Sequence, residues 1–282
     1  MTPLRQRMFE DMQMRNLAPS TQETYVRAVA QFAEYFMRSP EVLSREHVRQ
    51  YLLYLVQERH LSPSTYNVAQ SAIQFLYRFT LGRDGPVHNI PCARNQKRLP
   101  VVLSPDELRR FFAAILIPRH TAIFLTAYGT GLRAEELTML RIADIDSGQM
   151  LIRVNLGKGR KDRFVKLSPF LLKSLRDYYR ACRPADLLFP GRGGRQMSPK
   201  SVTKAAEAIA LRAGIGKAVG AHTFRHTYAT HMLDAGADLA TIQALMGHGS
   251  LRTTSIYLHV SKAKINAAPS PLDQLFAGSP QP

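Results

Sequence analysis

Helical periodicity stops between Gly82 and Pro100, and this break divides the chain. The stretch GRDGPVHNIPCARNQKRLP has no apolar repeat, contains several glycines and prolines, and ends in basic residues, as linkers commonly do. Regular apolar spacing resumes after Ser104. A chain of 282 residues has room for one large domain or two ordinary ones. We therefore expect a first domain over 1–90, a linker over 91–103 and a second domain over 104–282.

The first 90 residues have the patterns of helices only. A short helix is expected near the N-terminus, a second over about 20–37, a third from Ser44 and a fourth from Ser62. Ser20 and Glu23 have the spacing of a capping box at the start of the second helix. The sequence thus predicts an N-terminal four-helix-type bundle.

The second region mixes two periodicities. SPDELRRFF combines a serine cap, a proline at the first helical position and a glutamate that closes a capping box, and helices are expected over 105–116 and 119–128. QMLIRV and DRFVKL are short β-rich runs separated by NLGKGRK, which indicates an antiparallel hairpin with a basic tip. Helices return from Ser168 to about Lys264. The fold class predicted is mainly α, with a small antiparallel β-sheet in an α+β C-terminal domain.

The balance of charge points to a polyanionic partner. The chain has 38 lysines and arginines against 21 aspartates and glutamates, with a pI near 10.3. The first candidate for the partner is therefore nucleic acid, and the second is an anionic membrane surface. No apolar run approaches the roughly 20 residues that span a bilayer, and the N-terminus lacks the apolar core of a secretion signal. Cys92 and Cys182 form no C-x-x-C pair, which argues against a disulfide scaffold and fits a reducing compartment. We expect a cytoplasmic protein.

GTGLRAEEL contains the outline of a dinucleotide-binding fingerprint. The residues before it do not have the bounds of a strand, and no acidic residue follows at the required distance. A simpler interpretation is that Gly129 and Gly131 make a tight turn that sets Arg133 at the start of a helix, with Glu135 and Glu136 in its first turn. Taken alone, this arginine fits a surface charge as well as a binding site.

GKGRKDR is a glycine-containing basic stretch at the expected hairpin tip. It lacks the spacing of a Walker A loop. One interpretation is a solvated hairpin tip, and the other is a loop that reaches a phosphate or a groove of DNA. The cations that such a loop would offer are Lys158, Arg160, Lys161 and Arg163.

AHTFRHTYATHML places histidines and an arginine on one helix. His222 and His226 have the spacing of helical zinc ligands, but Thr223 stands where a zinc protease needs its glutamate. Arg225 would also put a fixed cation beside a metal. His222 and Arg225 share a helix face at i and i+3. A guanidinium beside an imidazole suits a phosphate oxygen rather than a metal.

The stretch LATIQALMGHGSLRTTSIYLHV adds two more groups. Gly247 can end a helix, His248 follows it, and Tyr257 lies nine residues later. A helical tyrosine by itself is usually a packing residue. However, the second domain supplies arginines, a lysine, histidines and a tyrosine without a carboxylate pair, cysteine nucleophile or metal cage, and this complement suits phosphoryl transfer to tyrosine.

These motifs, in their order and spacing, resemble those of the tyrosine site-specific recombinases, the phage integrase family that includes the bacterial Xer-type enzymes. The resemblance covers essentially the whole chain and departs from the family by about one extra residue before the lysine. The six family positions correspond to Arg133, Lys158, His222, Arg225, His248 and Tyr257. The resemblance implies a helical DNA-binding bundle of the SAM-like type followed by a catalytic domain, with no metal or other cofactor and no ATP.

The resemblance implies that the Tyr257 hydroxyl attacks a DNA phosphodiester to give a 3′-phosphotyrosine. Tyrosine, with a pKa of about 10, needs help to lose its proton, and His222 is the expected base. Lys158 is expected to protonate the departing 5′-oxygen, because lysine gives up a proton more readily than arginine. Glu136 is interpreted either as orienting Arg133 or as compensating the helix start, and the second interpretation is preferred.

The expected phosphate ligands are Arg133, Arg225 and His248, which would bind the non-bridging oxygens of the phosphorane. Arg160, Lys161 and Arg163 are expected to bind DNA. The resemblance implies a dimer on one site and a homotetramer, or a related heterotetramer, on two duplexes. A DNA-binding protein without catalysis and a type IB topoisomerase are the alternatives. The proline-rich tail around Leu272 to Phe276 is interpreted either as frayed or as a segment that docks on a partner.

Overall fold

The structure is a computed structural model, and it describes residues 2–94, 99–155, 162–247 and 254. It divides into two compact units, Met1–Lys97 and Arg98–Pro282, each of which is described by itself. Among the described residues, no helix has the length and apolar character needed to cross a membrane.

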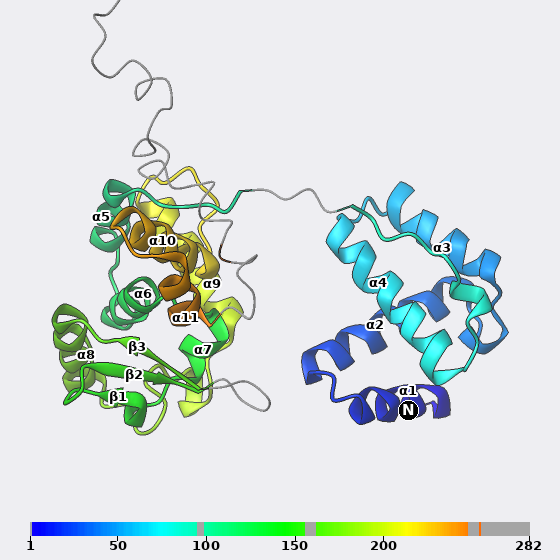
Figure 1. Cartoon of the computed structure of the whole chain (residues 1–282), viewed down its shortest axis with the longest axis horizontal. Helices are drawn as coiled ribbons and strands as arrows, with labels where there is room; N and C mark the ends of the chain where they lie inside the picture. The colour runs from blue at the N-terminus through cyan, green and yellow to red at the C-terminus, as the bar shows by residue number, and fades with distance from the viewer. Residues whose placement is uncertain (1, 95–98, 156–161, 248–253, 255–282) are drawn as a thin grey trace, which may run out of the picture. The chain divides into compact units, whose positions relative to one another are not determined.

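Four α-helices form the N-terminal unit, as predicted (Figure 1). The main packing is between α2 and α4, and a π-helical turn over Leu76–Thr80 continues α4. The core is aromatic and aliphatic, with Phe32, Ile73 and Tyr77 completely buried. The helices are α1 (Pro3–Met14), α2 (Pro19–Phe36), α3 (Arg45–Gln57) and α4 (Pro63–Phe75), with short 3-10 turns η1 (Pro40–Val42) and η3 (Gly85–Val87).

Two of the predicted helix starts are confirmed and one capping motif is wrong. Ser62 caps α4 by accepting a hydrogen bond from the Thr65 N–H, and Ser44 precedes α3. The Ser20–Glu23 capping box does not form, because α2 begins at Pro19 and Ser20 already lies in its first turn. The proline, which needs no partner for a backbone N–H, starts the helix two residues before the start that a Ser20 cap would give.

The non-periodic stretch after the bundle is partly packed. The Tyr66 hydroxyl donates to the Pro91 carbonyl at 3.2 Å, and the Asn67 side chain exchanges hydrogen bonds with the Ala93 backbone at 2.8 and 2.9 Å. Toward the other unit, the fully buried Leu103 donates its N–H to Thr227 Oγ1 at 3.1 Å. Pro91 and Ala93 are therefore bound to the first unit, and Leu103, the last residue of the predicted linker, is bound to the second.

The second unit combines seven described helices with a small sheet (Figure 1). Helix α6 packs against both α8 and α10. Phe111, Phe124 and Phe224 pack against one another in the core in edge-to-face and tilted arrangements, with ring centroids 4.9 to 5.2 Å apart. This contact fixes α10 relative to α6. The helices are α5 (Pro105–Ala113), α6 (Pro118–Thr130), α7 (Ala134–Met139), α8 (Pro169–Cys182), α9 (Pro199–Arg212), α10 (Ala221–Asp234) and α11 (Leu239–Met246), with 3-10 turns η4 (Ile142–Asp144) and η5 (Arg192–Gly194).

The sheet is antiparallel in the order β1-β2-β3, formed by Ile145–Asp146, Leu151–Val154 and Arg163–Lys166. The predicted hairpin is confirmed, and its tip, residues 156–161, lies outside the described residues. Strand β1 was not expected, because two residues are too few to give an alternating pattern. Ile152 and Val165 face each other across the hairpin on its buried side. The predicted fold class, mainly helical with a small antiparallel sheet, is confirmed.

Candidate active site

A tight turn between α6 and α7 positions Arg133. Gly131 ends α6 with a left-handed backbone (φ 63°), and a Cβ there would lie 2.5 Å from the Tyr228 ring, so only glycine fits. Arg133 follows as the N-cap residue of α7. The predicted turn is confirmed for Gly131, whereas Gly129 lies inside α6 rather than in the turn.

Helix α10 carries His222 and Arg225. The Arg225 side chain is buried, with 4% of the residue exposed, and it donates from Nη1 to the Gly131 carbonyl at 2.7 Å and from Nη2 to the Met246 carbonyl at 2.6 Å. This arginine therefore links the turn before α7 to the end of α11.

The C-terminal end of α11 is held by three arginines. Successive carbonyls of Leu245, Met246 and Gly247 accept hydrogen bonds from Arg163 Nε at 2.8 Å, Arg225 Nη2 at 2.6 Å and Arg133 Nη2 at 3.1 Å, respectively. Carbonyls at the end of a helix lack partners inside the helix and carry its negative dipole end. Cations are therefore favourable partners for all three.

A single carboxylate joins two of these arginines. Glu136 Oε1 accepts from Arg133 Nη1 at 2.8 Å and from Arg163 Nη1 at 2.9 Å, while Oε2 accepts from Arg163 Nη2 and from the Arg133 N–H, both at 2.8 Å. The expectation that Glu136 only compensates the helix start is wrong, since its carboxylate is buried and binds the Arg133 guanidinium directly.

The ionisation of Glu136 reflects these contacts. Burial by itself would raise its pKa, but the hydrogen bonds and charge of Arg163, together with those of Arg133, lower the pKa from its ordinary value of 4.5 to about 2. The carboxylate is therefore charged at neutral pH.

Arg163 is not placed as the sequence predicted. We expected it to bind DNA with its neighbours Arg160 and Lys161, but its side chain is 9% exposed and its guanidinium is engaged by Glu136 and the Leu245 carbonyl. In β3 buried and exposed residues alternate, so Arg163 shares the inward face with Val165. In the sequence only Val165, Lys166 and Leu167 alternate, and extending this period backwards would place Arg163 on the same face as Val165. Arg160 and Lys161 lie outside the described residues.

The two neighbouring histidines of α10 are both less basic than usual. Partial desolvation lowers the pKa of His222 below 6.5 although the residue has an exposed edge, and the charges of Arg225 and Arg133 lower it further against an opposing effect of Glu135. Burial, followed by His222 and Arg225, lowers the pKa of His226 to about 4. Both imidazoles are therefore neutral at pH 7.

Three of the six expected catalytic residues fall in the described part of the chain, and these are gathered around one place. Arg133 and Arg225 bind adjacent carbonyls at the end of α11, and both act on the pKa of His222. Lys158, His248 and Tyr257 lie outside the described residues, as does the C-terminal tail. Within the described ranges, no group of three or more histidine, cysteine, aspartate or glutamate side chains could hold a metal ion.

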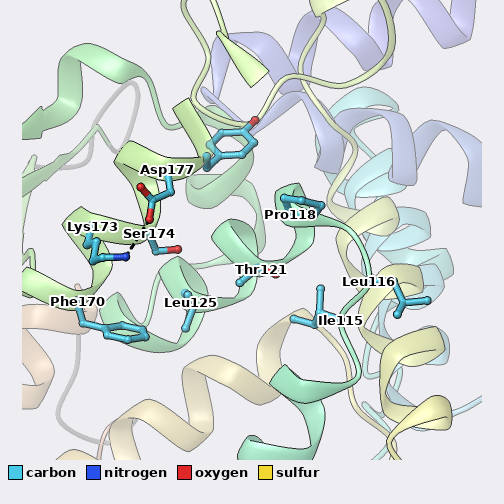
Figure 2. Close-up of a pocket in the computed structure, with 10 residues that line it drawn as sticks. Ile115, Leu116, Pro118, Thr121, Leu125, Phe170, Lys173, Ser174 and Asp177 are labelled. Carbon is cyan, nitrogen blue, oxygen red and sulfur yellow. Dashed lines mark hydrogen bonds and ion pairs between the residues drawn. The ribbon is translucent and has the colours of Figure 1, made fainter. Parts of the chain in front are cut away.

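A separate hollow of about 440 Å³ lies between α6 and α8 (Figure 2). Its wall includes the exposed Leu116 and Phe170, and the Lys173–Asp177 ion pair lies at its edge with a distance of 3.1 Å. None of the three described catalytic candidates lines this hollow. The arginine cluster at the end of α11 is thus the better candidate site.

Comparison with known proteins identifies the family. The phage integrase family matches residues 101–264, and the phage integrase N-terminal SAM-like domain matches residues 4–86. The putative integrase/recombinase y4qK of Sinorhizobium fredii is 44% identical over 284 residues, covering 100% of this chain and 92% of that protein. Tyrosine recombinase XerD of Oceanobacillus iheyensis is 30% identical and covers 89% of this chain and 91% of its own length.

Solved structures agree with this result. A post-cleavage complex of the XerH site-specific recombinase with palindromic difH substrate has a TM-score of 0.72 at 26% identity, covering 92% of this chain and 82% of that one. The chain therefore belongs to the phage integrase family, which confirms the resemblance seen in the sequence. It is a tyrosine recombinase, an enzyme of site-specific DNA recombination and integration.

The depressed pKa of Glu136 predicts a pH-dependent contribution to stability. Because the pKa is lower in the folded state, the stabilisation is complete above pH 4.5 and is lost as the pH falls toward 2. A shift from 4.5 to about 2 corresponds to about 3 kcal/mol. We expect the free energy of unfolding of wild type to exceed that of Glu136→Gln by this order at pH 6, and the difference to shrink below pH 4.5. Urea denaturation followed by circular dichroism would measure it.

The exposed neighbour Glu135 provides the control, since Glu135→Gln should leave the pH profile close to that of wild type. A wild-type advantage over Glu136→Gln that stays constant from pH 6 to pH 2.5 would contradict the assignment.

Proposed function

We propose that this recombinase cuts and rejoins DNA by two transesterifications through Tyr257. In the first, the tyrosine oxygen bonds to phosphorus, the bond from phosphorus to the 5′-oxygen breaks, and that oxygen leaves as a hydroxyl. In the second, a 5′-hydroxyl from a partner duplex attacks the 3′-phosphotyrosine and releases the tyrosine. Each step exchanges one phosphate ester for another, so the bond energy is retained and ATP is not consumed.

The observation that carries this proposal is the arrangement of Arg133 and Arg225. They come from different helices, yet their Nη2 atoms bind the adjacent carbonyls of Gly247 and Met246. The chain then continues directly to His248. Arg133 is only partly buried, and a guanidinium has five N–H donors. Two such groups beside each other suit the developing negative charge on the non-bridging oxygens of a phosphorane.

The remaining roles follow from the chemistry of each group. A tyrosine with a pKa of about 10 is mostly protonated at pH 7, and the neutral His222 supports the role of the base that accepts its proton. His248 adds a donor to the phosphate. Lys158 gives a proton to the departing 5′-oxygen, which is a poor leaving group as an alkoxide.

The DNA partner is supported by charge and by related structures. The chain has a formal charge of +17. The structure of XerH has been solved in complex with difH substrate, and that of lambda integrase as a dimer bound to a core site. We propose that this protein binds its recombination site as a dimer and joins two duplexes as a homotetramer in the cytoplasm. Arg160 and Lys161 are the proposed DNA contacts in the hairpin.

Replacing the nucleophile tests the central step. The recombination site is first obtained by sequencing DNA trapped covalently on the full-length protein, and a nicked duplex of that sequence then serves as a suicide substrate. Wild type should form a covalent adduct, and Tyr257→Phe should form none while its DNA affinity stays within about threefold, because only the nucleophilic oxygen is removed. Denaturing electrophoresis and gel-shift titration measure the two quantities. Adduct formation by Tyr257→Phe would exclude Tyr257 as the nucleophile.

Replacing Arg225 by lysine tests the phosphate ligand. Lysine keeps the charge but cannot bind a helix carbonyl and a phosphate through a planar fork. We expect the single-turnover cleavage rate of Arg225→Lys to fall on the order of 100-fold or more. A rate within threefold of wild type would remove Arg225 from the proposed site.

The depressed pKa of His222 predicts how cleavage depends on pH. The neutral imidazole is the active form of a base, so the rate should be constant at neutral pH and fall in acid, with a midpoint below 6.5. Single-turnover rates between pH 5 and 8, at protein concentrations well below saturation so that they report the pKa values of the free enzyme, would measure this. His222→Gln should lose the inflection as well as activity. An identical inflection in wild type and His222→Gln would show that another group is responsible.

A further inference from the structure

We propose that Arg163 is a positioning residue that fixes the end of α11, and with it the chain entering His248, against the pair formed by Glu136 and Arg133. The inference rests on the proposed function, because it concerns the same site. It replaces the DNA-binding role that the sequence suggested for this arginine.

All three nitrogens of the Arg163 guanidinium are engaged inside the protein. Nη1 and Nη2 donate to the two oxygens of Glu136 at 2.9 and 2.8 Å, and Nε donates to the Leu245 carbonyl at 2.8 Å. Both charged side chains are buried, with 9% and 8% of the residues exposed. A planar fork with a third donor at its side can hold a carboxylate and a carbonyl at once, whereas a lysine ammonium is a point donor.

The place that Arg163 holds is the part of α11 closest to the proposed chemistry. Leu245 is two residues before Gly247, whose carbonyl accepts from Arg133. Gly247 has a left-handed backbone (φ 59°), and a Cβ on it would lie 3.1 Å from Arg163 Nη1. The arginine is therefore packed directly under the turn that leads to His248. A shift of Gly247 would move the carbonyl that accepts from Arg133.

Arg163 is itself anchored by the hairpin. Its backbone pairs with Val154 in the register of β2 and β3, and β3 contacts α11. In the sequence Arg163 comes five residues after Lys158. One side chain thus connects the base of the hairpin that bears the proposed general acid to the helix end that precedes the proposed phosphate ligand.

Arg163 differs from Arg133 and Arg225 in the role that it is given. Those two are proposed to bind the phosphate as well as a helix carbonyl. Removing Arg163 would leave the Leu245 carbonyl without this donor and would leave Glu136 to Arg133 and its backbone N–H. Without Arg163, the Glu136 carboxylate would bind one guanidinium instead of two, and the position of the Arg133 guanidinium would change. Removal of Arg163 should therefore lower the rate of the cleavage step.

The test compares Arg163→Met and Arg163→Lys with wild type on the nicked suicide substrate at saturating protein. We expect the single-turnover rate constant to fall at least about 30-fold for the methionine variant and less for the lysine variant, which keeps the charge but not the fork. DNA affinity should change less than threefold in both. Arg153→Met, which removes an exposed arginine from the adjacent strand, should keep the wild-type rate constant.

Amplitude and rate constant separate positioning from loss of folding. A general structural role would lower the fraction of protein that forms adduct when the substrate is in excess and leave the rate constant of the active fraction unchanged, which would overturn the proposal. A loss confined to DNA affinity would indicate that Arg163 contacts DNA, and this result would also overturn the proposal that it is a positioning residue. If Arg163→Met does not fold, the rate constant of Arg163→Lys decides, and a value within twofold of wild type refutes the inference.

The link through Glu136 is tested by combining the changes. If Arg163 and Glu136 act as one unit, the double variant Glu136→Gln with Arg163→Met should lose no more than the more severe single variant. Losses that multiply would show independent action and contradict the link. Failure of the proposed function is distinguishable, because wild type would then form no adduct through Tyr257 in the same assay, whatever Arg163 does.

Discussion

The described part of the site depends on the contact between guanidinium groups and the last carbonyls of α11. Three arginines, from a turn, a strand and a helix, donate to three consecutive carbonyl oxygens, and one buried carboxylate binds two of the three guanidinium groups. Side chains that are locked by such bonds lose little freedom when a substrate arrives, which favours stabilisation of a transition state. The cluster keeps an excess of positive charge, and a phosphate is the natural partner for that excess.

The aromatic core explains why this contact can be made accurately. Phe111, Phe124 and Phe224 fix α10 on α6. Helix α10 carries Arg225, and α6 ends at the Gly131 turn. The same arginine donates to the Gly131 carbonyl. Packing therefore determines the geometry of the polar site, and Gly131 is needed because the Tyr228 ring occupies the space of a side chain.

Much of the fold could be predicted from the sequence, because the helices have clear apolar spacing and capping residues. The two-residue strand β1 could not, since it is too short to have a period. Within the site, Arg133 and Arg225 were identifiable from their motifs. The contact of Glu136 with Arg133 is local, but its contact with Arg163 of β3 is a long-range one that no local pattern encodes. Arg163 was misassigned because its basic neighbours suggested an exposed loop, although the alternation of Val165, Lys166 and Leu167 places it in phase with Val165.

The position of Arg163 at the first residue of β3 has a consequence for modifying this enzyme. Side chains of a strand change face with every residue, so the distance from Arg163 to Val165 must be kept for the arginine to stay beneath α11. Loop length can vary on the far side of Asp162 without changing that parity. Hairpin grafts between related recombinases should accordingly be joined before residue 163, never inside the strand.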